Sequence, residues 1–204
     1  MSMRISLPRP LTLLLGGLLL INLLQAFSTE LIFDEAYYWY YAQNPAWGYF
    51  DHPPMVAWMI ALGTWFLDNE LGVRLLSCIL GVGTILLIWS LTGHPDKKTY
   101  VREFFVWALS ITLLQAYGFL SLPDTPLLFF TALFLWFYKA FLKHPGPGMA
   151  LLLGISMAAL MYSKYHAALV ILFVLMSNLS LLKNRYAWLA LVVSLLCYLP
   201  HLNW

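Results

Sequence analysis

Long apolar runs separated by short polar segments dominate this chain of 204 residues. Several of these runs approach the ~20 residues that a helix needs to cross a bilayer. The fifth and sixth runs are short, so the residues between them, 163–166, must form a tight turn near the lipid headgroups. The pattern predicts an all-α, polytopic membrane protein with about seven transmembrane helices. The expected spans are 11–28, 71–92, 103–121, 125–142, 148–163, 166–182 and 187–203.

One further apolar run, 54–67, is short for a span, and it begins after Pro53, where proline suits a helix start. We expect this segment to lie flat in the membrane interface or to be re-entrant. If it crossed the bilayer, the basic residues Lys97, Lys98 and Arg102 would move to the outer side, against the positive-inside rule. We therefore expect an outer loop over about 29–70 that contains interfacial helices.

Composition and charge support this topology. The chain is 62% hydrophobic and 10% charged, whereas about a quarter of the residues in soluble domains are charged. With a cytoplasmic N-terminus, most of the basic residues fall inside and most of the acids outside. The inside residues are Arg4, Arg9, Lys97, Lys98, Arg102, Lys139, Lys143, Lys183 and Arg185; the outside acids are Glu30, Asp34, Glu35, Asp51, Asp68, Glu70 and Asp124.

The chain reads as one transmembrane domain over residues 1–204. No small-residue cleavage site follows the first apolar run, so we expect this run to be retained as a membrane helix. The chain ends where the seventh helix reaches the outer face, without a polar tail. We expect it to be the N-terminal portion of a longer protein.

The segment 34–54 is the most unusual part of the predicted outer loop, because it gathers three carboxylates, one histidine and eight aromatic rings. Asp34 and Glu35 begin a short predicted helix that ends at Asn44. They could be an N-cap and first-turn acids favoured by the helix dipole. Alternatively, a carboxylate shielded from water could act as a general base. Tyr37 and Tyr38 suit an aromatic belt and could also stack on a sugar ring.

Two other outer segments carry candidate polar groups. Asp51 and His52 precede a predicted helix start, where they could serve as a cap or bind a phosphate or metal. One histidine and one aspartate are too few to define a metal site, so metals and cofactors remain unassigned. Asp124 lies in a short turn whose geometry favours aspartate. It is also expected on the same face as Asp34.

Lys164 is a basic residue on the outer side, against the general charge bias. It could extend to the headgroups, or it could have a partner or function, because a lysine at membrane depth is costly. Arg74, near the start of the second span, invites the same argument. Together these two residues could form a phosphate site at the outer leaflet.

These segments resemble the bacterial branch of glycosyltransferase family 39, the protein O-mannosyltransferase-like family that includes the lipid A aminoarabinose transferases. The first motif block carries most of the resemblance, and later segments follow in the same order along almost the whole chain. The matching segments are Phe33–Tyr38, Asp51–Pro54, Leu71–Leu75, Leu122–Phe130 and Gly154–Tyr165.

The resemblance implies the C-type glycosyltransferase fold and a polyprenyl-phosphate sugar donor. It implies that Asp34 is the catalytic acid of the first loop, with Glu35 beside it and Asp124 as the second acid. It also implies that Arg74 and Lys164 handle the donor phosphate or support the site.

The resemblance also places His52 where the family handles the donor phosphate or supports the site. Some relatives, however, carry a Glu-Lys pair where this chain has Asp51-His52. We expect Asp51, His52, Tyr37 and Tyr38 to contribute to substrate binding.

The activity implied is transfer of a hexosyl or pentosyl group to a hydroxyl of a lipid, glycan or protein. The reaction would invert the anomeric centre at the outer face of a bacterial cytoplasmic membrane. Nucleic acid is not an expected partner. Two other classes stay open: a transporter or flippase for an amphipathic anionic lipid, and a non-catalytic membrane subunit. Transporters usually place their binding residues near the midplane on broken helices, whereas the acids here fall in outer loops.

Overall fold

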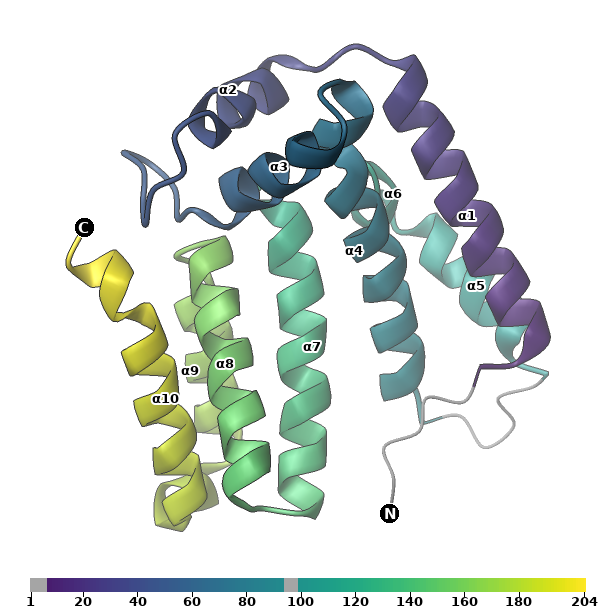
Figure 1. The fold of residues 1–204 in the computed structure, drawn as a ribbon. Coiled ribbons are helices and arrows are strands. Elements are labelled where there is room, and N and C mark those ends of the chain that lie inside the picture. Colours follow the sequence, from purple (N-terminus) through teal and green to yellow (C-terminus); the bar gives the residue numbers. More distant parts are fainter. Residues whose placement is uncertain (1–6, 94–98) are drawn as a thin grey trace. The chain divides into compact units, whose positions relative to one another are not determined.

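The computed structural model describes residues 7–93 and 99–204, and in these ranges the regular secondary structure is entirely helical. The chain forms two compact units (Figure 1). Unit 1 comprises the described parts of Met1–Pro45 and Val56–Thr125, and unit 2 comprises Ala46–Met55 and Pro126–Trp204. Some residues used in the topology prediction lie outside the described residues. They are Arg4, Lys97 and Lys98.

Two long apolar helices form the body of unit 1: α1 (Arg9–Ser28) and α4 (Glu70–Leu91). Both are long and apolar enough to cross a membrane, and α1 packs along α4. The side chain of Asn69 caps α4 by accepting a hydrogen bond of 3.0 Å from the Gly72 N–H. The predicted spans 11–28 and 71–92 are therefore helices with nearly the expected limits.

Two shorter helices of unit 1, α2 (Phe33–Ala42) and α3 (Met55–Phe66), run across the direction of α1 and α4 (Figure 1). The 12 residues of α3 cover only about 18 Å at 1.5 Å per residue, less than the ~30 Å hydrocarbon core. The turn into α4 is tight, because a Cβ on Gly63 would meet the Gly72 carbonyl oxygen, and one on Gly72 would meet the Leu67 carbonyl oxygen. The length of α3 agrees with the prediction that this segment does not span.

The single helix predicted over 103–121 is wrong. The structure has α5 (Val101–Ser110) and α6 (Thr112–Ala116), separated at Ile111, whose backbone is extended. Breaking the helix leaves carbonyl groups without their helical partners. The side chain of Gln115 satisfies one of them by donating to the Ala108 carbonyl at 3.2 Å. Apolar periodicity does not record a polar side-chain contact of this kind, so it did not reveal the break.

The helices of unit 2 are α7 (Asp124–Lys143), whose first two residues belong to unit 1, α8 (Pro147–Ser163), α9 (Ala167–Ser177), a 3₁₀ helix η1 (Leu179–Lys183) and α10 (Arg185–Leu202). The closest packing is between α8 and α10, where a Cβ on Gly154 would lie 2.5 Å from the Ala190 carbonyl oxygen. The predicted turn at 163–166 is confirmed, because α8 ends at Ser163 and α9 begins at Ala167.

The helix predicted over 166–182 is also wrong, since it stops at Ser177 and continues as η1 after Asn178. Asn178 leaves the helical conformation and donates from its side chain to the Tyr138 hydroxyl at 3.4 Å. In the described ranges, four helices are long and apolar enough to span: α1, α4, α7 and α10. The helices α3, α8 and α9 are apolar but shorter, so the count of seven spans remains a prediction.

Candidate active site

The first turn of α2 places two neighbouring acids in opposite environments. Asp34 is exposed, whereas Glu35 is completely buried. The cap of this helix is Ile32, so the interpretation of Asp34 as an N-cap is wrong. The Glu35 carboxylate instead accepts a hydrogen bond of 3.2 Å from the Ile32 N–H. Both acids still lie in the first turn, where the helix dipole favours negative charge.

Glu35 forms an ion pair with Arg74 of α4, and the side chains are 0% and 1% exposed. The guanidinium binds both carboxylate oxygens, with Arg74 Nε donating to Glu35 Oε1 at 2.8 Å and Nη2 donating to Oε2. This bidentate geometry is the strong form of an arginine–carboxylate contact. It fixes the start of α2 to α4.

The remaining Arg74 donors bind the segment between α1 and α2. Nη1 donates to the Thr29 carbonyl and hydroxyl oxygens, each at 2.8 Å, and to the Ala26 carbonyl at 3.3 Å. Nη2 donates to the Glu30 carbonyl at 2.8 Å. Burying a charge is tolerable only when its hydrogen-bonding groups are satisfied. Every nitrogen of this guanidinium has such a partner.

Ser121 extends the network toward the second predicted acid. Its N–H donates to Glu35 Oε1 at 2.9 Å, and its hydroxyl donates to the Val73 carbonyl at 2.6 Å. Ser77 of α4 forms a hydrogen bond of 2.8 Å with the Ser121 hydroxyl. Asp124, half-buried, begins α7 three positions later. The network thus connects the first acidic loop, α4 and the turn that leads to Asp124.

Burial separates the possible roles of these residues. Asp34 is exposed and can contact a substrate directly. Glu35 is buried, so it can affect a substrate only through other groups. Direct contact between Arg74 and a phosphate would require the network to open, because its nitrogens already donate within unit 1. The roles predicted for these three residues in catalysis and binding remain predictions.

The aromatic residues of α2 also divide by burial. Tyr37 is partly exposed at 36%, and Tyr38 is buried at 7%. Their rings meet edge to face with centroids 5.3 Å apart. Tyr37 also shares a hydrogen bond with the Tyr41 hydroxyl. Tyr37 is therefore held in a fixed orientation with part of its ring accessible.

The segment Ala46–Met55 belongs to unit 2 and contains the Asp51-His52 pair. The two side chains lie 3.1 Å apart, between His52 Nδ1 and an Asp51 carboxylate oxygen, and both are partly exposed. Tyr49 shapes the loop, because its hydroxyl accepts from the Ala46 N–H at 3.1 Å and its N–H donates to the His52 carbonyl at 3.2 Å. Burial raises the pKa of Tyr49.

Lys164 is the C-cap residue of α8 and is half-buried in the turn before α9. Its backbone is extended, and its carbonyl accepts from the Ala167 N–H at 3.0 Å. The neighbouring Tyr165 is 47% exposed. The position at a helix end agrees with the sequence expectation, while the predicted phosphate contact is untested.

His201 of α10 is the residue of this region that the sequence prediction missed. Its Nδ1 is 2.7 Å from the Trp47 carbonyl oxygen and must donate, because a carbonyl only accepts. Its Nε2 lies 3.4 Å from the Tyr165 hydroxyl. A Cβ on Gly48 would come within 3.0 Å of Nδ1. His201 therefore connects the loop that carries Asp51 and His52 to the turn that carries Lys164.

No local sequence signal marks His201, because its partners lie 154 and 36 positions away. The one available hint was a histidine in the last turn of an apolar helix, where a polar ring needs a partner.

The predicted site residues thus fall into two sets. Unit 1 brings together Glu35, Arg74 and the segment before Asp124, with Asp34 and Tyr37 on the same helix as Glu35. Unit 2 contains Asp51, His52 and Lys164. The phosphate site predicted from Arg74 with Lys164 draws on both units and remains a prediction. Within residues 7–93 and 99–204, no cluster of three His, Cys, Asp or Glu residues could hold a metal ion.

The chain belongs to the dolichyl-phosphate-mannose-protein mannosyltransferase family, whose model matches residues 51–204. This match confirms the resemblance to glycosyltransferase family 39. The helical architecture with several apolar helices agrees with a multi-pass membrane protein of this family.

Two relatives add detail. The chain is 26% identical over 186 residues to lipid A galacturonosyltransferase RgtD of Rhizobium johnstonii, covering 87% of this chain and 39% of that protein. It is 34% identical over 90 residues to an uncharacterized protein of Aquifex aeolicus, covering 42% of this chain and 18% of the relative. The chain therefore spans less than half the length of either protein. No solved structure matches it.

Proposed function

We propose that this chain carries the first acidic loop of a membrane glycosyltransferase that moves a sugar from a polyprenyl-phosphate donor to an acceptor hydroxyl. The observation that carries the proposal is the contrast between exposed Asp34 and buried Glu35, in a chain of this family. An exposed acid held by a buried network is suited to meet a substrate in a fixed position. The reaction is proposed to occur at the outer face of the cytoplasmic membrane.

In this mechanism Asp34 is the general base. The first turn of α2 holds its backbone, because the next residue is fixed by Arg74, Ser121 and the Ile32 N–H. Positioning of this kind lowers the entropic cost of bringing the base to the acceptor. Asp34 accepts the proton of the acceptor hydroxyl, a step that typically contributes a factor of ~10²–10⁴.

The acceptor oxygen then forms a bond to the anomeric carbon while the bond from that carbon to the phosphate oxygen breaks. The lipid phosphate leaves with the bonding electrons and gains negative charge. Lys164, at the end of α8, is proposed to stabilise that charge as a preorganised cation. Direct displacement inverts the anomeric centre.

The other predicted residues receive supporting roles. Glu35 and Arg74 position Asp34 through the buried ion pair. The accessible part of the Tyr37 ring is proposed to stack on a sugar, with Tyr38 supporting it from below. Asp124 is proposed as the second acid.

On the other unit, Asp51 and His52 are proposed to contact the donor headgroup. Their mutual contact of 3.1 Å orients the imidazole.

A lipid acceptor is the best-supported choice. RgtD is named as a transferase that acts on lipid A, and a membrane-bound donor is most easily paired with an acceptor in the same interface. Membership of a glycosyltransferase family favours the enzyme over the transporter or flippase.

The test is a transfer assay with the full-length protein in membranes or nanodiscs. Polyprenyl-phosphate-linked sugars and nucleotide sugars of the same kind are offered separately, and the released lipid phosphate is quantified. We expect the glycosylated acceptor to form only with the lipid-linked donor. Lipid phosphate should be released in an amount equal to that product. Lys164→Met should raise the half-saturating donor concentration, and Lys164→Arg should raise it less. Transfer from the nucleotide sugar, or no lipid phosphate release, would contradict the proposal.

A further inference from the structure

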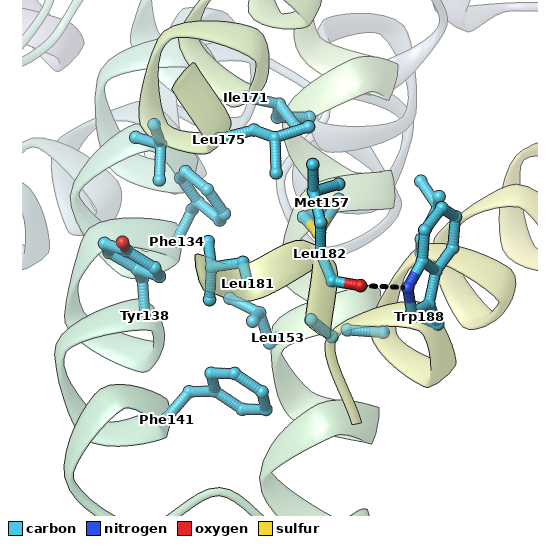
Figure 2. Close-up of a pocket in the computed structure, with 14 residues that line it drawn as sticks. Phe134, Tyr138, Phe141, Leu153, Met157, Ile171, Leu175, Leu181, Leu182 and Trp188 are labelled. Carbon is cyan, nitrogen blue, oxygen red and sulfur yellow. Dashed lines mark hydrogen bonds between the residues drawn. The ribbon is translucent and has the colours of Figure 1, made fainter. Parts of the chain in front are cut away.

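The helices of unit 2 line an apolar pocket that the proposed reaction does not use (Figure 2). Its volume is about 130 Å³, similar to cavities that hold a benzene-sized apolar group. Rings from α7 form one side, including Phe134 and Phe141. Leu153 and Met157 of α8 and Leu181 of η1 form other parts of the wall. Residues of α9 and α10 complete it.

The few polar groups at this pocket already have partners. The Trp188 indole N–H donates to the Leu182 carbonyl at 2.9 Å, as the dashed line in Figure 2 shows. The Tyr138 hydroxyl accepts from the Asn178 side chain at 3.4 Å. The pocket wall therefore presents hydrocarbon to an occupant.

The pocket extends from the middle of unit 2 toward the end opposite to Lys164. It is lined by the second half of α7, the middle of α8, the middle and second half of α9, η1 and the first turns of α10. Met157 and Leu153, which line the pocket from α8, are 7 and 11 positions before Lys164, about 10 and 16 Å along the helix at 1.5 Å per residue. In the predicted topology the pocket extends away from the donor phosphate, toward the cytoplasm.

Exposed cations surround this end of unit 2. Lys183 ends η1 directly after two lining leucines, Arg185 begins α10, and Lys143 ends α7. Arg185 donates to the Tyr186 hydroxyl at 2.8 Å and lies over its ring. Residues 126–204 contain no Asp or Glu. These cations therefore have no carboxylate partner within that stretch of chain and can bind an external anion.

An apolar pocket beside cations at the cytoplasmic side of membrane helices suits an anionic lipid. We propose that part of one hydrocarbon chain of an anionic glycerophospholipid occupies the pocket, with the lipid phosphate bound by Lys183 and Arg185. The apolar wall holds the chain, while the two cations select the charged headgroup. This site would bind a lipid of the surrounding membrane and take no part in sugar transfer.

The test measures lipid binding to the purified full chain in detergent by native mass spectrometry and by thermal shift. Phosphatidylglycerol and phosphatidylcholine with identical acyl chains are compared. Two basic residues near a headgroup, at roughly 1 kcal/mol each, correspond to a preference of roughly 25-fold for the anionic lipid. The double variant Lys183→Gln/Arg185→Gln should remove that preference. Arg102→Gln, which removes an exposed cation of α5 in unit 1, should leave it unchanged.

A second set of variants tests the pocket itself. Ala187→Phe and Val174→Phe place a ring in the cavity from α10 and α9, and each should weaken binding of both lipids. Leu196→Phe adds a ring on the same helix at a residue that is 59% exposed and outside the pocket, so it should have no effect.

Three results would overturn the proposal. They are equal binding of the two lipids by the wild type, unchanged binding by folded pocket-filling variants, and displacement of phosphatidylglycerol by a lower concentration of polyprenyl phosphate. The last result would assign the pocket to the donor lipid instead.

Discussion

Different kinds of contact stabilise the polar region within unit 1 and the polar region within unit 2. In unit 1, a fully buried ion pair between Glu35 and Arg74 organises the surrounding backbone. In unit 2, His201 links loop and turn through a hydrogen bond of 2.7 Å to Trp47 and a longer contact to Tyr165, both of which are about half-exposed. The first arrangement is rigid because its charges have no solvent to replace a lost partner. The second can exchange its partners for water.

This difference suggests that the two regions have different roles in the proposed reaction. The buried network can fix a catalytic acid in place throughout the reaction. The half-exposed contacts of His201 suit a loop that must admit a lipid-linked donor and release its product.

The comparison predicts its largest stability effect at the ion pair. Arg74→Met should lower the free energy of unfolding by about 3–5 kcal/mol, because it leaves the Glu35 charge buried without a partner. Thermal unfolding in detergent would measure this loss. In combination with Glu35→Gln, the loss should be clearly smaller than the sum of the two single variants. Additive losses would show that the two residues act independently.

An intermediate effect is expected where helices pack on glycine. A Cβ on Gly81 would lie 2.6 Å from the Gly118 Cα in unit 1, and one on Gly154 would lie 2.5 Å from the Ala190 carbonyl oxygen in unit 2. Each change to alanine should cost about 1–3 kcal/mol through overpacking.

The matched control is Gly16→Ala in α1, where no atom lies within 4 Å of the new Cβ. This variant should be neutral or stabilising by up to ~1 kcal/mol because alanine favours the helix. A similar loss at all three glycines would point to a general helix effect and not to close packing.

The smallest effect is expected at His201. His201→Phe keeps a ring but loses the donor to the Trp47 carbonyl, so it should cost only about 0.5–1.5 kcal/mol. Hydrogen exchange should nevertheless become faster in the loop around Gly48. His201→Asn retains a donor group and should slow exchange again. A loss as large as that of Arg74→Met would remove the distinction between the two regions.

The sequence predicted the helical class, the family and the limits of several long helices, because apolar runs of that length have few alternatives in a membrane. It did not predict the helix breaks at Ile111 and Asn178. At the first break the Gln115 side chain bonds the Ala108 carbonyl, and at the second the Asn178 side chain bonds the Tyr138 hydroxyl. Apolar periodicity does not record such contacts.

The site shows the same limit. Adjacent acids at 34 and 35 were recognised as a pair, but their opposite burial follows from a residue 39 positions away from Glu35. The sequence placed Arg74 near the start of a span and suggested phosphate binding. It could not show that the first acidic loop would wrap around the guanidinium. His201 was missed for the same reason, since its partners come from distant segments.

The most direct test of the account compares Asp34→Asn with Glu35→Gln in one experiment that measures both transfer rate and folded fraction. Asp34→Asn should keep its thermal stability and lose transfer by a factor of ~10²–10⁴, because an exposed base is removed. Glu35→Gln should be clearly destabilised by loss of the buried pair. Asp68→Asn, which removes another exposed acid, should change neither property. Normal transfer by a folded Asp34→Asn protein would contradict the proposed role of Asp34 and the division of labour between the two acids.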